Sequence, residues 1–284
     1  MNILITGSSG YLANFFIKEF LKGSHNILTI SLKNPLNDSK ALNLNELNSD
    51  FAVESLTNFK PTHVIHFAGL AHKIFSSNDI DNYLFSNFYF SRYIASIADF
   101  FKVKQFIFIS SIGVFENHIN HNLEINHKIK PSCKSPYGVS KLKMEYFLKD
   151  FTSNKNLKYT IIRPPLVIGP NPPGNLKILL KALKNNLPIP YNLFKKPKKF
   201  IAIDNLSSFI FWTLDNELAF NRTFNICDDK YYSVSEIVSK ISKIQNLEMR
   251  YLPFSNFLAK VISNIPFLKI FYRKLERELL IDDS

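Results

Sequence analysis

Short apolar runs alternate with helical patterns along the first 165 residues of the chain. The runs predict buried strands at 2–6, 26–32, 63–68, 105–110 and 159–164. Apolar positions spaced three and four residues apart predict helices at 10–22 and 83–101, and a further helix that begins near Tyr137. Strands that alternate with helices favour a parallel sheet covered on both faces. The expected fold class is therefore α/β, with a Rossmann-like doubly wound parallel sheet.

The pattern becomes less regular after the proline-rich stretch RPPLVIGPNPPGN at 163–175. Helices are expected at 176–186, 205–215 and 233–244, and short strands at 200–203 and 223–227. Residues 254–280 are apolar with interspersed lysines and are interrupted by Pro266. We therefore expect a core domain at 1–165 and a smaller lobe at 166–284 that is partly interleaved with it.

Composition narrows the class of protein. The chain has 284 residues, of which 46% are hydrophobic and 20% charged, so it can bury a core. Two cysteines in no metal-ligand spacing argue against a disulfide framework or zinc site. No signal peptide or transmembrane segment is visible, which predicts a cytoplasmic location. The net charge of +12 favours anionic partners. It is mostly scattered lysine without a nucleic-acid-binding motif, so we expect no nucleic-acid partner.

A glycine-containing turn follows the first predicted strand and opens the first helix. In ITGSSGYLA (5–13), Gly7 permits a tight turn and Gly10 allows backbone amides to approach a pyrophosphate at the positive end of the helix. This context predicts a dinucleotide cofactor. Ser31 stands after the second strand, where an acidic residue would favour NAD, and Lys33 is close by. NAD and NADP both stay open, with a weak preference for NADP.

Five motifs occur in order: TGSSGYLA, VIHFAGLAH (64–72), FISSIGVF (108–115), YGVSK (137–141) and RPPLVIGP (163–170). Together they strongly resemble the extended short-chain dehydrogenases, the NAD-dependent epimerase/dehydratase family. The last motif and KKFIAIDNL look most like UDP-hexose 4-epimerases and 4-keto-sugar reductases of surface-polysaccharide pathways. The resemblance implies a nucleotide-sugar substrate bound by the smaller lobe, and a homodimer through the long helices.

The resemblance also assigns roles to individual residues. Ser111, Tyr137 and Lys141 fall on the catalytic triad. The cofactor-binding positions are Gly7, Ser9, Gly10, Tyr11, Leu12, Ser31, Phe67, Ala68, Gly69, Asn87, Tyr137, Lys141 and Pro164. The substrate-binding positions are Ser111, Ile112, Asn175, Lys198 and Arg273. Lys199 and Arg277 are alternatives to Lys198 and Arg273 as partners of the substrate diphosphate.

The triad residues suit proton transfer coupled to hydride transfer. Tyrosine has a pKa near 10, and a lysine one helical turn away lies on the same face. We expect the charge of Lys141, with that of oxidised nicotinamide, to lower the pKa of Tyr137. Ser135 is a good N-cap and Pro136 suits the first helical position, which places Tyr137 at the positive end of its helix.

One departure from the family pattern reduces the number of reactions that we expect this protein to catalyse. Dehydratases that this sequence resembles carry an Asp-Glu pair directly after the triad's serine or threonine, whereas Ile112 and Gly113 stand here and cannot transfer protons. Epimerisation or ketoreduction at carbon 4 is therefore expected, and dehydration is disfavoured. The alternative is a non-catalytic dinucleotide-binding regulator, which the abrupt end at Ser284 favours.

Weaker signals allow more than one interpretation. His63, His66 and His72 surround a predicted strand, but alternation would place His63 and His66 on opposite faces, so we expect core roles and no metal. The apolar and basic segment at 257–280 is either a pair of packed lobe helices or a membrane-surface helix, and we favour packing.

Overall fold

The computed structural model describes residues 1–20, 25–31, 41–43, 47, 49–71, 80–121, 123–188, 194–250 and 278–281. They form two compact units. The first comprises residues 1–116, 131–165 and 203–226, and the second comprises 117–130, 166–202 and the described part of 227–284. The chain therefore passes between the units several times. One of these passages is at Pro165, where the core was expected to end.

The first unit is built on a parallel sheet, as the alternating pattern predicts. Its described strands have the order β3-β2-β1-β4-β5-β6-β9, and every neighbouring pair is parallel. The strands are β1 (Asn2–Thr6), β2 (Asn26–Ser31), β3 (Ala41–Asn43), β4 (His63–His66), β5 (Gln105–Ile109), β6 (Lys158–Arg163) and β9 (Arg222–Asn225). The order reverses at β1, as in a doubly wound fold. The Rossmann-like class is thus confirmed.

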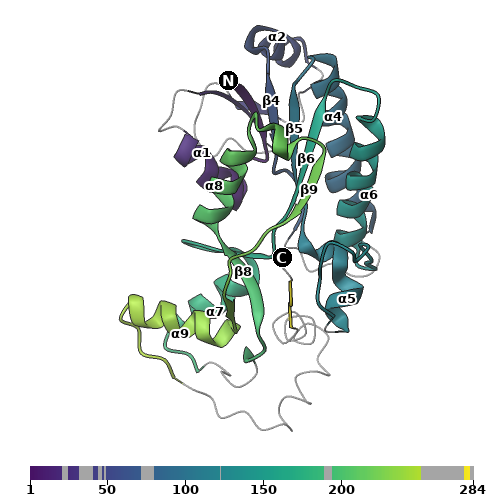
Figure 1. Ribbon diagram of the computed structural model, residues 1–284. Coiled ribbons are helices and arrows are strands. Elements are labelled where there is room, and N and C mark those ends of the chain that lie inside the picture. Colours follow the sequence, from purple (N-terminus) through teal and green to yellow (C-terminus); the bar gives the residue numbers. More distant parts are fainter. Residues whose placement is uncertain are drawn as a thin grey trace. The chain divides into compact units, whose positions relative to one another are not determined.

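Helices cover both faces of this sheet (Figure 1). On one side lie α1 (Tyr11–Phe20) and α8 (Ile203–Thr213). On the other lie α4 (Phe90–Phe100) and α6 (Pro136–Phe151), with α4 preceded by α3 (Ile80–Leu84) and a π-helical turn, η2 (Phe85–Tyr89). Ile94 and Ala98 of α4 share a buried core with Met144 of α6 and with Phe106 and Phe108 of β5. The helix α2 (Asp50–Phe59), which the pattern did not predict, begins at the N-cap Ser49.

The second unit contains a smaller mixed sheet. Its described strands are β7 (Leu166–Ile168), β8 (Lys198–Ala202) and β10 (Tyr231–Tyr232), in the order β10-β8-β7. The amphipathic helices α7 (Gly174–Lys184) and α9 (Val234–Ile244) pack together through a shared core that includes Leu176, Leu179, Val234 and Val238. The predicted helices and strand here are confirmed, whereas 251–277 lies outside the described residues.

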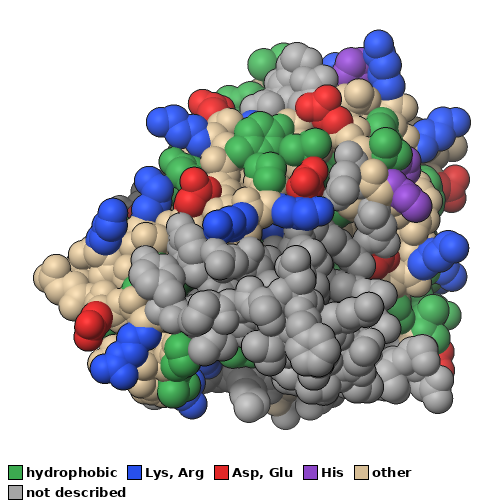
Figure 2. All heavy atoms as spheres, turned by 90° about the horizontal axis from the view of Figure 1, so that it is seen from below, with side chains coloured by type: hydrophobic (Ala, Val, Ile, Leu, Met, Phe, Trp, Pro, Cys, Tyr) green, Lys and Arg blue, Asp and Glu red, His purple; other side chains and the backbone are tan. Residues whose placement is uncertain are grey.

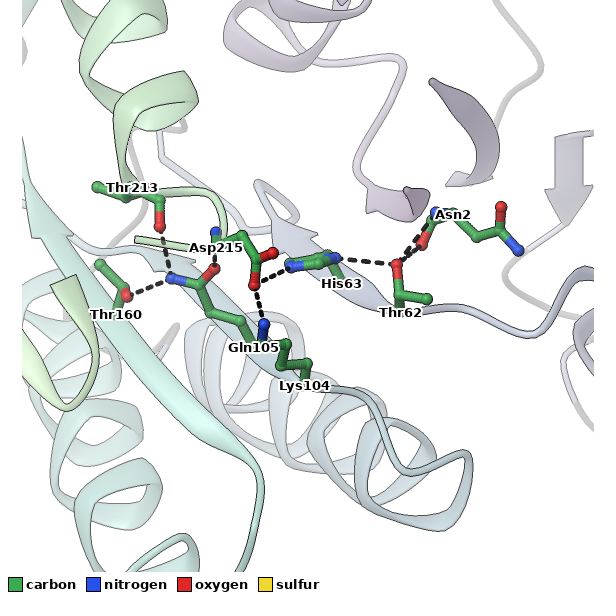
Figure 3. A network of polar contacts seen from close by, with 8 residues as sticks. All are labelled: Asn2, Thr62, His63, Lys104, Gln105, Thr160, Thr213 and Asp215. Carbon is green, nitrogen blue, oxygen red and sulfur yellow. Dashed lines mark hydrogen bonds and ion pairs between the residues drawn. The ribbon is translucent and has the colours of Figure 1, made fainter. Parts of the chain in front are cut away.

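A polar network fixes the amino-terminal ends of the strands in the first unit (Figure 3). The buried Gln105 donates from Nε2 to Thr160 Oγ1 at 2.8 Å and to the carbonyl of Thr213 at 2.9 Å. Its Oε1 accepts from the backbone N–H of Asp215 at 3.1 Å. The carboxylate of Asp215 pairs with Lys104 and lies 3.8 Å from His63 Nε2. The network therefore ties the end of α8 to β4, β5 and β6.

Among the described residues, the charged side chains on the face seen in Figure 2 do not form one continuous basic patch. The described Lys and Arg side chains occur there singly or in pairs, with Asp and Glu side chains among them. In the part of the chain that the structure describes, no helix has the length and apolar character needed to cross a membrane.

Candidate functional site

The turn after β1 lies directly against the segment that follows β4. Gly7 has a φ of +76°, and a Cβ at this position would lie 2.7 Å from the backbone N and Cα of Ala68. Only glycine accommodates both this conformation and this approach. Gly10 N–H donates to the Gly7 carbonyl at 2.8 Å and closes the turn. Because α1 then begins at Tyr11, its first N–H groups lack intrahelical partners and mark a site for phosphate.

Two hydroxyl groups at this turn are buried without a hydrogen-bond partner among the described residues, Ser8 Oγ and Tyr11 Oη. Burial raises the pKa of Tyr11 to about 12, and the nearby Asp204 carboxylate adds to the rise. Buried polar atoms are nearly always paired, so these two fit a site that takes up a polar ligand or water. Ser8 was not predicted from the sequence, although it lies inside the glycine-containing turn.

The segment after β4 places a second glycine beside two predicted site residues. Gly69 has a φ of +156°, and a Cβ there would lie 2.9 Å from Asn87 Oδ1 and 3.2 Å from Lys141 Nζ. The segment is held to β1 by the N–H of Phe67, which donates to the Thr6 carbonyl at 3.2 Å. The cofactor segment predicted at Phe67 to Gly69 therefore lies beside both Asn87 and Lys141.

Asn87 is fully buried in the π-helical turn η2, and its amide is engaged on both sides. Oδ1 accepts from Leu70 N–H at 2.6 Å, and Nδ2 donates to the Leu70 carbonyl at 3.1 Å and to Ser140 Oγ at 3.0 Å. Asn87 thus joins the segment after β4 to α6. Single π-helical turns are frequent at functional sites.

Ser111 follows β5 and forms the N-cap of a short 3₁₀-helix, η3 (Ile112–Phe115), with its Oγ accepting from Gly113 N–H at 3.0 Å. Its hydroxyl also hydrogen-bonds the phenol of Tyr137. Tyr137 lies in the first turn of α6. There Ser135 is the N-cap, accepting from Gly138 N–H at 3.3 Å, and Pro136 opens the helix, as the sequence predicts. The end of β5 and the start of α6 therefore bring the two hydroxyls together.

Lys141 lies one turn further along α6 and is buried. Its Nζ donates to the Ile109 carbonyl at 2.8 Å and lies 4.7 Å from the centre of the Phe108 ring. Burial lowers the pKa of Lys141 to about 8, and the Glu145 carboxylate opposes this shift. The three predicted catalytic residues are thus assembled within the first unit.

The direction of the Tyr137 shift differs from the expectation. Burial raises the pKa of Tyr137, and Tyr83 adds to the rise, while the hydrogen bond from Ser111 opposes it. The ammonium group of Lys141 donates to the carbonyl of Ile109. Tyr137 and Lys141 do lie one turn apart on α6, as predicted. The removal of the phenol from water nevertheless has the larger effect on the pKa of Tyr137.

The remaining predicted positions fall in different places. Ser31 is buried at the end of β2, and Pro164 is buried directly after β6. Ile112 is 7% exposed, and its N–H donates to the Pro164 carbonyl at 3.0 Å, so an apolar group stands where dehydratases carry an acid. Lys33, His72, Arg273 and Arg277 lie outside the described residues.

Two predicted substrate residues belong to the second unit. Asn175 is half-buried at the start of α7, and Lys198 is buried in β8. The neighbouring Lys199 is also buried. Its Nζ donates to the Asp229 carbonyl at 2.8 Å and lies 4.6 Å from the centre of the Tyr231 ring. Lys199 therefore binds within its own unit.

The histidines of β4 have separate surroundings. His66 is fully buried, with Nδ1 2.8 Å from Thr6 Oγ1 and Nε2 2.8 Å from Ser91 Oγ. Burial holds the pKa of His66 well below its usual range, and Lys141 lowers it further. His63 lies in the network at the other end of the strand. Among the described residues, no group of three or more His, Cys, Asp or Glu side chains could hold a metal ion.

Sequence reasoning missed a buried acid on the catalytic helix. Glu145 is 1% exposed and pairs with Arg163, the first residue of the motif RPPLVIGP. Its position four residues after Lys141 could have indicated that Glu145 is buried, because the two residues lie on the same, buried face of α6.

Comparison with known proteins agrees with this geometry. The sequence model that describes the NAD dependent epimerase/dehydratase family matches residues 3–227 of this chain. The UDP-glucose 4-epimerase of Vibrio cholerae is 26% identical over 246 residues, covering 85% of this chain and 75% of that protein. The structure of the Thermotoga maritima UDP-glucose 4-epimerase with UDP-glucose superposes with a TM-score of 0.77 at 19% identity, covering 99% and 90% of the two chains. The Bacillus cereus UDP-glucuronic acid 4-epimerase with NAD gives 0.74 at 20% identity, covering 89% and 85%.

Proposed function

Because the chain belongs to the NAD-dependent epimerase/dehydratase family, we propose that it oxidises or reduces carbon 4 of a nucleotide-linked hexose. A UDP-sugar is the first class to test, since the similar proteins from Vibrio cholerae and Thermotoga maritima are UDP-glucose 4-epimerases. The observation that carries the proposal is the cluster of Ser111, Tyr137 and Lys141 beside Gly69.

The residues of the first unit fit a nicotinamide dinucleotide. The pyrophosphate would lie on the turn at Gly7 to Gly10, where backbone donors and the start of α1 are available. The nicotinamide ribose would lie near Gly69 and Lys141, which approach each other closely because Gly69 has no side chain. The bound nicotinamide would supply the hydride acceptor or donor and, when oxidised, a positive charge that favours the phenolate form of Tyr137.

The protein's own groups would then handle the proton and the orientation of the sugar. Tyr137 Oη exchanges a proton with the oxygen on carbon 4. Ser111 Oγ, already hydrogen-bonded to Tyr137, holds the same oxygen. Lys141, positively charged below its pKa of about 8, would favour the phenolate and could donate a hydrogen bond to a ribose hydroxyl of the bound dinucleotide.

Epimerisation and net ketoreduction fit this site, and dehydration does not. Elimination of water requires further proton-transfer groups next to Ser111, where Ile112 is buried and Gly113 has no side chain. Ser31 at the end of β2 leaves NADP acceptable, because its hydroxyl carries no negative charge that would repel a 2′-phosphate. Tightly bound NAD in the purified protein would favour epimerisation, and preferential binding of NADPH would favour reduction.

Replacing Tyr137 with Phe tests the mechanism. Turnover of a UDP-hexose panel, followed by NMR of the carbon 4 configuration, should fall by at least ~100-fold, because general acid–base catalysis contributes about that much. Dinucleotide binding should persist. Tyr146→Phe is the matched control, since Tyr146 is on the same helix and 56% exposed. Unchanged turnover in Tyr137→Phe contradicts the mechanism. Dinucleotide binding without turnover in the parent protein supports a non-catalytic regulator instead.

We also propose that the protein forms a homodimer. Helices η2 and α4 carry Phe85, Tyr89 and Phe100, all with exposed aromatic side chains. Exposed apolar groups that gather on one set of helices are typical of interaction surfaces. Sedimentation equilibrium at micromolar concentration should give twice the chain mass of 32.8 kDa, and a single-chain mass contradicts the proposal.

A further inference from the structure

Helix α6 carries a buried carboxylate that the proposed proton transfer does not use. Glu145 is 1% exposed and follows Lys141 by four residues and Tyr137 by eight. Residues at these spacings lie on the same side of a helix. A buried carboxylate costs several kcal/mol unless it is paired and hydrogen-bonded, so its partners indicate what it does.

The carboxylate of Glu145 joins the ends of two strands to the helix. Ser110 Oγ donates to Oε1, at the residue directly before Ser111. Arg163 at the end of β6 donates from Nε to Oε1 at 3.0 Å and to Oε2 at 3.2 Å, and from a terminal nitrogen to Oε2. Breaking this pair on one side would leave a charge buried and unpaired.

Lys141 and Glu145 bind consecutive residues of the same strand end. Lys141 Nζ donates to the carbonyl of Ile109, and Glu145 accepts from the hydroxyl of Ser110. The next residue is Ser111, whose hydroxyl meets Tyr137. The distance between the two catalytic hydroxyls is therefore set by two neighbouring side chains of α6 that hold the end of β5.

Glu145 also provides negative charge near the buried ammonium group. The groups around Lys141 are Glu145 and Tyr137 on α6, His66 on β4 and, beyond Glu145, Arg163 on β6. His66 is neutral, because burial holds its pKa well below the usual range. The carboxylate thus counteracts the burial that lowers the pKa of Lys141.

We propose that Glu145 is a positioning residue that holds the end of β5 against α6 and serves as the buried counter-charge that keeps Lys141 protonated. The kinetic part of this inference rests on the proposed function. Its electrostatic part concerns the ligand-free protein and can be tested without any substrate.

The electrostatic test follows the Nζ and Cε signals of Lys141 by NMR in protein labelled with ¹³C,¹⁵N-lysine, with Lys141→Met as the assignment control. In Glu145→Gln the titration midpoint of Lys141 should fall by about one pH unit, because a neighbouring negative charge is removed. Asp150→Asn is the matched control: it removes an acid from the same helix at an exposed position and should leave the midpoint unchanged.

A second variant separates charge from folding. Glu145→Gln leaves Arg163 buried without its partner and can lose stability for that reason alone. In Glu145→Gln combined with Arg163→Gln the unpaired charge is removed. Removal of the Arg163 positive charge offsets part of the loss of Glu145, so the Lys141 midpoint should lie between those of Glu145→Gln and the parent in this folded variant. The alkaline limb of turnover should move to lower pH with it. A parental Lys141 midpoint in either folded variant overturns the proposal, whether or not the protein turns over a nucleotide sugar.

Discussion

The amide of Gln105 should contribute strongly to stability, although it is remote from the catalytic residues. Replacing it with Leu keeps a side chain of similar size but removes three hydrogen bonds in the network of Figure 3. The change acts on the joint between β5, β6 and the end of α8. It therefore tests whether this network holds α8 to the sheet.

The expected loss can be estimated from the groups left behind. Each neutral buried hydrogen bond contributes a net ~1 kcal/mol, and a buried group left unsatisfied costs about 1–3 kcal/mol. The Thr213 carbonyl loses its contact with Gln105, while the Asp215 N–H lies near the surface and can bind water. The apolar Leu side chain recovers part of the loss by burial. We therefore expect a decrease of roughly 2–4 kcal/mol in the free energy of unfolding.

The chain provides its own probe for this measurement. Its single tryptophan, Trp212, lies in α8 directly before Thr213 and packs near Phe209 and Phe224. Its fluorescence during urea unfolding reports whether α8 leaves the sheet, and an unchanged m-value would show that the same surface is exposed. Lys104→Gln is the control, because it removes a half-exposed ion pair with Asp215 and a contact with the Phe220 ring and should cost under ~1 kcal/mol.

A double-mutant cycle with Thr160→Val measures the coupling itself. Thr160 accepts from Gln105 and also donates to the Ala219 carbonyl at 2.8 Å. If the hydrogen bond is formed as the structure shows, the two substitutions should be non-additive by about 0.5–1 kcal/mol or more. Additive effects, or a Gln105→Leu midpoint equal to that of the parent, would refute the assignment of the network.

Two further substitutions probe a titration and a close backbone approach. Burial lowers the pKa of His63 to about 4, so stability should fall as pH falls from 6.5 towards 4, by up to ~3 kcal/mol, and His63→Gln should flatten this part of the stability–pH curve. Gly7→Ala should cost about 2–5 kcal/mol and abolish dinucleotide binding, because its Cβ would overlap Ala68. In urea unfolding the exposed Ser9→Ala should change stability by under ~0.5 kcal/mol, and equal costs for both would contradict the overlap.

The strands and helices that position the site could be predicted because each is marked by a short segment of neighbouring residues. A buried strand, a glycine turn and a helix start succeed one another at residues 2–13, and each has its own sequence signature. The start of α6 was likewise marked by Ser135 and Pro136, so the place of Tyr137 followed from two residues. Parallel strand order then brings Ser111 to the same edge of the sheet.

Other features depend on contacts between distant parts of the chain and left little trace. The strands β3, β7 and β10 have two or three residues each, too few for a periodic pattern. The π-helical turn around Asn87 is held by Leu70 and Ser140, which no local pattern connects to it. The pairing of Glu145 with Arg163 joins a helix to a strand and required the fold.

The raised pKa of Tyr137 shows what helical spacing alone does not predict. Four residues along a helix place a lysine and a tyrosine on one face, but they do not fix where the ammonium group binds or how much water surrounds the phenol. In the protein alone, Lys141 binds the Ile109 carbonyl and burial raises the pKa of Tyr137. A site of this kind keeps the tyrosine protonated until positive charge arrives beside it.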